Sequence, residues 1–124
     1  MTEPIATDTL ENGLTITYVD RSRPYFGGYY RVQVEITTSV QLEEWMFVDQ
    51  ETFHNACRLL GSSVTYRRLV EKMGVASTEL ARVRTEIVES FQENALGYLK
   101  SDDFPERFVQ GEYAKIIAKP SYRL

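Results

Sequence analysis

The sequence predicts an α+β fold in which an antiparallel β-hairpin packs against one long amphipathic helix and one or two shorter helices. Two segments with alternating apolar and polar side chains predict the strands, and a third with apolar side chains three or four residues apart predicts the helix. We expect a single domain over residues 1–124, which is long enough to bury a hydrophobic core without disulfides.

The hairpin is predicted by residues 14–20 and 29–40. In the first segment Leu14, Ile16 and Tyr18 alternate with threonines, as in a strand with one buried face. The second segment alternates in the same way, with one apolar row (Tyr30, Val32, Val34, Ile36) and one polar row (Arg31, Gln33, Glu35).

The length of the hairpin loop follows from the two apolar rows. A two-residue Gly27-Gly28 loop would pair even-numbered with odd-numbered residues and separate the rows onto opposite faces, which is strongly disfavoured. A three-residue loop, Phe26-Gly27-Gly28, places Tyr18 opposite Ile36 and keeps both rows on one face. We therefore predict the three-residue loop.

This register also predicts a cluster of arginines and tyrosines on the face turned away from the core. Arg23 then lies opposite Arg31, and like charges in that position are unfavourable. An anionic group nearby would relieve the repulsion: a carboxylate of the chain itself, the acidic surface of a partner, or a phosphate. The predicted outer residues are Arg21, Arg23, Tyr25, Tyr29 and Arg31.

Two helices and an ambiguous segment follow the hairpin. Asp49 is a typical N-cap for a short helix that Gly61 would end. Residues 63–75 match both helical and strand patterns. We favour a strand because a third strand would stabilise a two-stranded sheet, and we leave the helix open.

Residues 77–100 predict the long helix, capped by Ser77 or Thr78. Asp103 and Glu106 have the spacing of a capping box for a C-terminal helix interrupted by Gly111, or else for an extended arm. The predicted core consists of Leu14, Ile16, Tyr18, Val32, Val34, Ile36, Leu80, Val83, Ile87 and Phe91.

The contiguous side chains of Trp45, Met46 and Phe47 fit neither periodicity. We interpret the Trp45–Val48 segment as an exposed apolar patch, and such patches usually mark contact surfaces. Trp45 and Phe47 therefore join the arginines and tyrosines of the hairpin as candidate interaction residues.

Composition narrows the classes of function. A net charge of −4 weighs against attraction of the whole protein to nucleic acid or anionic membranes. The chain has one cysteine, which fits a reducing compartment, and we find neither a signal peptide nor an apolar stretch of the roughly 18 residues needed to span a membrane. We expect a cytoplasmic protein with no membrane partner.

No residue pattern indicates catalysis, a cofactor or a metal site. His54 and Cys57 are spaced to meet on one helix face, but a metal would need carboxylates such as Glu51 to complete its shell. We interpret Cys57 as a core residue and His54 as a surface residue. An enzyme is not indicated and not excluded.

Residues 66–84 allow a second interpretation of the ambiguous segment. With Gly74 as the turn glycine, "LVEKMGVASTELARV" resembles bacterial helix-turn-helix regulators, and the resemblance implies a DNA-binding face that includes Ser77, Thr78 and Arg82. This hypothesis requires that residues 63–71 are not a strand.

The motifs "FQENALGYL" and "DDFPERFV", together with "ENGLTITYVDRSRPYFGGYYRVQVEI", resemble a group of small uncharacterised bacterial proteins. The resemblance implies a bacterial housekeeping or accessory protein and no site residues. Our leading hypothesis is a non-catalytic interaction module that binds a protein partner or a second copy of itself as a homodimer. The alternative is the DNA-binding regulator.

Overall fold

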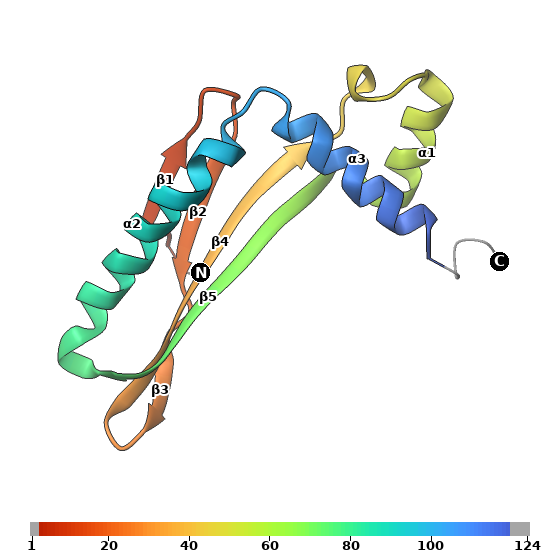
Figure 1. The fold of residues 1–124 in the computed structure, drawn as a ribbon. Helices are drawn as coiled ribbons and strands as arrows, with labels where there is room; N and C mark the ends of the chain where they lie inside the picture. Colours follow the sequence, from red (N-terminus) through yellow and green to blue (C-terminus); the bar gives the residue numbers. More distant parts are fainter. Residues whose placement is uncertain (1–2, 120–124) are drawn as a thin grey trace. The chain divides into compact units, whose positions relative to one another are not determined.

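A computed structural model describes residues 3–119 (Figure 1). It confirms the α+β class: five antiparallel strands form a sheet, accompanied by three helices. The elements are β1 (Ala6–Thr9), β2 (Thr15–Asp20), β3 (Arg23–Phe26), β4 (Tyr29–Gln41), α1 (Gln50–Leu60), β5 (Ser63–Ala76), α2 (Leu80–Leu99) and α3 (Phe104–Ile117).

The described residues form two compact units. The first, which we call the sheet unit, consists of the chain up to Thr38 together with Arg67–Lys100. The second, the helical unit, consists of Ser39–Tyr66 and the chain from Ser101 onward. Strands β4 and β5 contribute residues to both units. The expectation of a single domain stays a prediction.

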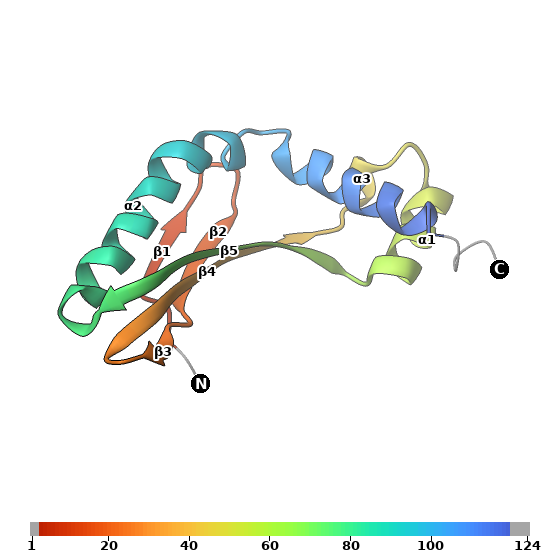
Figure 2. The same ribbon diagram turned by 60° about the horizontal axis from the view of Figure 1, so that its bottom comes forward.

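The sheet unit has the register that the apolar rows predict. Strand β2 pairs with β4 so that Tyr18 lies opposite Ile36, and β1, which the sequence did not predict, pairs with the other edge of β2. Helix α2 runs along one side of β1, β2 and β4 (Figures 1 and 2). We call the side beneath α2 the inner face and the opposite side the outer face.

The hairpin tip corrects the predicted loop. Phe26 pairs with Tyr29, so the loop has two residues, Gly27 and Gly28, both with positive φ (57° and 83°). Such a turn matches the twist of the strands it connects. The pairing shifts by one residue between Pro24 and Phe26, which leaves Tyr25 as a β-bulge. The bulge restores the register that a two-residue loop alone would lose.

The predicted core is buried except for Leu80, which is partly exposed. The difference arises because α2 begins at Leu80, after a 3₁₀ turn at Ser77–Glu79, and neither Ser77 nor Thr78 caps it. Below α2, the ring of Phe91 meets the ring of Tyr18 edge to face, with centroids 5.8 Å apart.

Strand β5 settles the ambiguous segment as a strand over Ser63–Ala76. The first helix of the proposed helix-turn-helix is therefore absent, and that interpretation of residues 66–84 is wrong. Gly74, with φ of 69°, lies within β5 and does not join two helices. This segment forms a strand because it pairs with β4. The side chains of Glu71 and Met73 accept hydrogen bonds from Gln33 and Arg31 of β4.

The helical unit contains α1 and α3. The Asp49 carboxylate accepts a hydrogen bond from the backbone N–H of Thr52 at 2.7 Å, which confirms the predicted cap, and Gly61 ends α1 with a φ of 87°. Helix α3 continues through Gly111 instead of breaking there.

The predicted capping box of α3 does not form. Asp103 has helical backbone angles and caps no backbone N–H, and its carboxylate accepts from Arg107 at 3.1 Å instead. The core of the helical unit consists of Val40, Leu42, Met46, Phe47, Ala56, Val64, Phe104 and Val109.

Candidate interaction surface

The outer face of the sheet unit carries the side chains of the odd-numbered residues of β4 and β5. Hydrogen bonds between these two strands fix that assignment, because Gln33 donates to Glu71 at 2.6 Å and Arg31 donates to the sulfur of Met73 at 3.3 Å. Side chains alternate between faces along a strand. No helix of the sheet unit covers this face (Figure 2).

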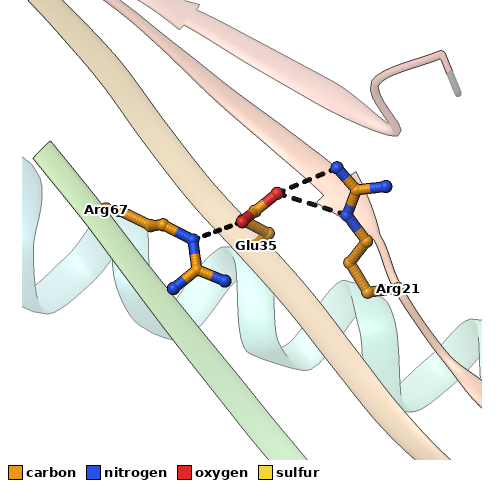
Figure 3. A network of polar contacts seen from close by, with 3 residues as sticks. All are labelled: Arg21, Glu35 and Arg67. Atoms are coloured by element: carbon orange, nitrogen blue, oxygen red, sulfur yellow. Dashed lines mark hydrogen bonds and ion pairs between the residues drawn. The ribbon is translucent and has the colours of Figure 1, made fainter. Parts of the chain in front are cut away.

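Glu35 lies at the centre of an ion-pair network on the outer face (Figure 3). Arg21, which follows β2, donates to one carboxylate oxygen through Nη2 at 3.0 Å and through Nε at 3.2 Å. Arg67 of β5 donates to the other oxygen. These bonds, with that from Arg67 foremost, hold the pKa of Glu35 below its ordinary value of 4.5. Glu35 thus links three segments across the sheet.

A second carboxylate, that of Glu71, lies beside the pair of opposed arginines, Arg23 and Arg31. Arg23 and Arg31 are direct cross-strand neighbours, as predicted. The anion near Arg31 is the chain's own Glu71, 3.8 Å from Arg31 Nε, which is one of the three sources the sequence left open. Arg23 makes no hydrogen bond or ion pair within residues 3–119. Its side chain is exposed.

Apolar side chains lie exposed among these charges. Tyr25 and Tyr29 are 56% and 50% exposed, as the sequence analysis expected. Phe26 is 79% exposed and shares the outer face because it pairs with Tyr29. Leu69 and Met73 of β5, which sequence reasoning missed, are 41% and 45% exposed. The sequence of residues 67–73 carries no alternation of apolar and polar side chains that could have marked them, and their exposure follows only from the pairing of β5 with β4.

The Trp45–Val48 segment is not a continuous apolar patch. Trp45 and Val48 are exposed, whereas Met46 and Phe47 are buried in the helical unit. The ring of Phe47 packs against Phe53 and Tyr113, with centroids 5.8 and 5.9 Å apart.

A 3₁₀ turn at Glu44–Met46 explains this split, because it directs successive side chains to different sides. Phe47 therefore does not belong to an exposed surface, and its assignment as an interaction residue is wrong. Trp45, whose indole N–H donates to Glu43 at 3.1 Å, remains a candidate.

His54 and Cys57 lie on α1, where His54 is exposed and Cys57 is partly exposed. The ring of His54 packs on that of Phe53, with centroids 5.7 Å apart. Among residues 3–119, no group of three or more histidine, cysteine or acidic side chains is placed to hold a metal ion.

A polar cluster joins β1, β2 and α2 at the inner face. The hydroxyl of Tyr18 donates to Asp8 at 2.6 Å, and the amide of Gln92 donates to the same carboxylate at 3.1 Å. Burial and the bond to Asp8 raise the pKa of Tyr18 well above its ordinary value of 10.0. The hydrogen bonds of this cluster connect α2 to β1 and β2.

A groove of about 190 Å³ lies between α2 and the inner side of β5. Its walls are partly apolar, and the cations Arg68 and Lys72 line it. The volume is below the roughly 300–1,000 Å³ typical of ligand pockets. We therefore assign it no ligand.

No family model, curated protein or solved structure matches the chain. Within the part of the chain that the structure describes, no helix is long and apolar enough to cross a membrane. The geometry of the outer face is therefore the basis on which a function is argued.

Proposed function

We propose that the chain is a binding module that holds an acidic protein partner on the outer face of its sheet unit. The observation that carries the proposal is the exposure of Tyr25, Phe26 and Tyr29 at the hairpin tip, with Met73 beside Arg31. Monomeric proteins seldom expose a large contiguous group of apolar side chains unless it binds something.

The residue types of the face suit protein recognition. Tyrosine and arginine are enriched among the residues that contribute most to binding at protein interfaces. Tyr29 and Arg31 adjoin each other on β4, and Arg23 lies opposite Arg31. An interface centred on these residues would bury aromatic rings and leave the arginine charges to bond partner carboxylates.

The charge of the face indicates an acidic partner. The outer face carries four arginines, Arg21, Arg23, Arg31 and Arg67, against two carboxylates, Glu35 and Glu71. This local excess of positive charge contrasts with the net charge of −4 for the chain. Complementary charge would speed the encounter with an acidic surface and orient it.

The test is an affinity capture from bacterial lysate with three tagged proteins. They are the wild type, a Tyr29→Ser/Arg23→Glu double variant on the outer face, and Arg82→Ser on α2 as a matched surface control. We expect the wild type and the control to retain one stoichiometric acidic protein after nuclease treatment, and the double variant to lose it. Circular dichroism verifies that all three are folded.

Two results would contradict the proposal. Capture that the double variant retains would place the contact elsewhere on the chain. Capture that nuclease abolishes would instead assign the arginines and aromatic rings to a single-stranded nucleic acid, since such ligands also stack on aromatic side chains and pair with arginine.

A further inference from the structure

Strand β5 forms an open edge of the sheet. Within residues 3–119 it pairs with β4 and with no other strand, so its opposite edge presents unpaired backbone groups. The strand has 14 residues, and no proline interrupts it. Its residues Arg67 to Leu69 and Glu71 to Gly74 are exposed. An open edge of this kind is a template for pairing with another strand.

We propose that β5 pairs antiparallel with β5 of a second copy of the chain, with Leu69 on the two-fold axis. The dimer would join two sheets edge to edge. This inference concerns the edge of the sheet, whereas the proposed partner surface is its outer face. The two proposals can therefore fail separately.

Symmetry limits the registers that such a dimer can adopt. The two-fold axis must be perpendicular to the sheet, because that operation alone makes the two strands antiparallel neighbours in one sheet. Outer-facing residues then meet outer-facing residues of the second copy. The axis must therefore pass through a residue position and not between two residues.

The register centred on Leu69 is self-complementary in charge. It places Arg67 opposite Glu71 of the second copy, and Glu71 opposite the second Arg67, both on the outer face. Leu69, 41% exposed in the single chain, meets its own copy on the axis. On the inner side Arg68 faces Val70, which brings no like charges together. Opposite charges directly across strands are stabilising.

Neighbouring registers lack this property. An axis at Arg67, Arg68 or Glu71 sets that charged residue against its own copy, and an axis at Val70 sets Arg68 against Lys72. Like charges directly opposite are destabilising. Charge therefore selects the register centred on Leu69 from among the central ones.

The existing contacts leave atoms free for the new pairs. Arg67 bonds Glu35 through Nε, which leaves its two terminal nitrogens available. Glu71 accepts from Gln33 through Oε2, which leaves Oε1 available. The dimer would thus extend the Glu35 network across the axis. The central pairs use residues 67–71 of the sheet unit alone.

The first experiment measures association by sedimentation velocity from micromolar to millimolar concentration. We expect a reversible dimer for the wild type. Arg67→Glu sets Glu against Glu71, and Glu71→Arg sets Arg against Arg67, so each variant alone should weaken the dimer about tenfold or more. A mixture of the two restores both opposite-charge pairs and should dimerise again. Circular dichroism of each variant checks its folding.

The second experiment tests the register by oxidation in a Cys57→Ser background. Leu69→Cys should form a cross-linked dimer, because directly opposite Cβ atoms lie about 4.5–5.5 Å apart, close to the spacing of a disulfide. Met73→Cys is the matched control. Its copies would be separated by eight residue positions along the strands, about 26 Å, and should not cross-link.

Three outcomes would overturn the inference: a wild type that stays monomeric throughout the concentration range, a mixture of variants that does not dimerise, or equal cross-linking at positions 69 and 73. None of them bears on capture of an acidic partner by the outer face, which the Tyr29→Ser/Arg23→Glu double variant tests independently.

Discussion

The two faces of β4 are built from adjacent residues and do different work. Val32, Val34 and Ile36 point inward and are 0% exposed beneath α2. Between them, Arg31, Gln33 and Glu35 point outward, partly exposed, into ion pairs and hydrogen bonds. The inner face gains its free energy from buried apolar area, whereas exposed charge pairs contribute little to stability. The outer face can therefore be specialised for binding without endangering the fold.

The largest expected effect comes from the inner face. Ile36→Ala should lower the free energy of unfolding by about 2–5 kcal/mol, because it leaves a cavity beneath α2. Met73→Ala, an apolar truncation of similar size on the outer face, should cost less than about 1 kcal/mol since Met73 is 45% exposed. Urea unfolding measures both. Equal losses for the two variants would refute the division between the faces.

A substitution at Thr38 also compares the two faces, but here the inner-face variant is expected to raise the free energy of unfolding. This inner-face threonine is 3% exposed, and its hydroxyl has no hydrogen-bond partner among the described residues. Thr38→Val removes the unpaired polar group and should raise the free energy of unfolding by about 1 kcal/mol. Thr37→Val on the outer face is the control and should change it by less than about 0.5 kcal/mol. A destabilised Thr38→Val protein would show that the hydroxyl is satisfied.

A smaller effect is expected for Glu35→Gln. At pH 7 the loss of the ion pairs should cost less than about 1 kcal/mol, because both arginines are solvent-exposed. The pKa of Glu35 is lower in the folded state, so its contribution is present above pH 4.5 and is lost as pH falls through the folded pKa. The difference between wild type and variant should therefore shrink in acid, as denaturant unfolding at pH 7 and pH 3 can measure. A difference that grows in acid would contradict this assignment.

The smallest expected effect comes from Arg23. Arg23→Gln removes the repulsion between Arg23 and Arg31 and should raise stability by a few tenths of a kcal/mol. Arg21→Gln, its matched control, removes a donor to Glu35 and should lower stability slightly. A loss of stability in Arg23→Gln would mean that Arg23 makes a stabilising contact within the chain, which would contradict its assignment as an unpaired arginine of the binding surface.

Local alternation was enough to predict the central pairing of the sheet unit. Tyr18 faces Ile36 because both belong to apolar rows that must share one face. Strand β1 could not be predicted in this way, since Ala6–Thr9 contains little apolar contrast and is defined by its pairing with β2. The bulge at Tyr25 was missed because two solutions, a longer loop or a bulge, satisfy the same constraint.

The candidate surface was predicted in part. The arginines and tyrosines of the hairpin were found because their strand periodicity was clear. Leu69 and Met73 were not, because residues 67–73 show no alternation of apolar and polar side chains, and only their pairing with β4 determines which of them lie on the outer face. Phe47 was misplaced because the direction of side chains in an irregular segment depends on the turn that precedes it, and sequence spacing does not report that turn.

The bulge at Tyr25 also determines where the hairpin can change length. Deleting Tyr25 would remove the one unpaired residue and leave Pro24 facing Tyr30 and Phe26 facing Tyr29. Deleting a paired residue such as Val34 would turn every later side chain of its strand to the opposite face. A chain shortened at position 25 therefore keeps its core. Natural length variation in this hairpin should accordingly be confined to the bulge and the loop beside it.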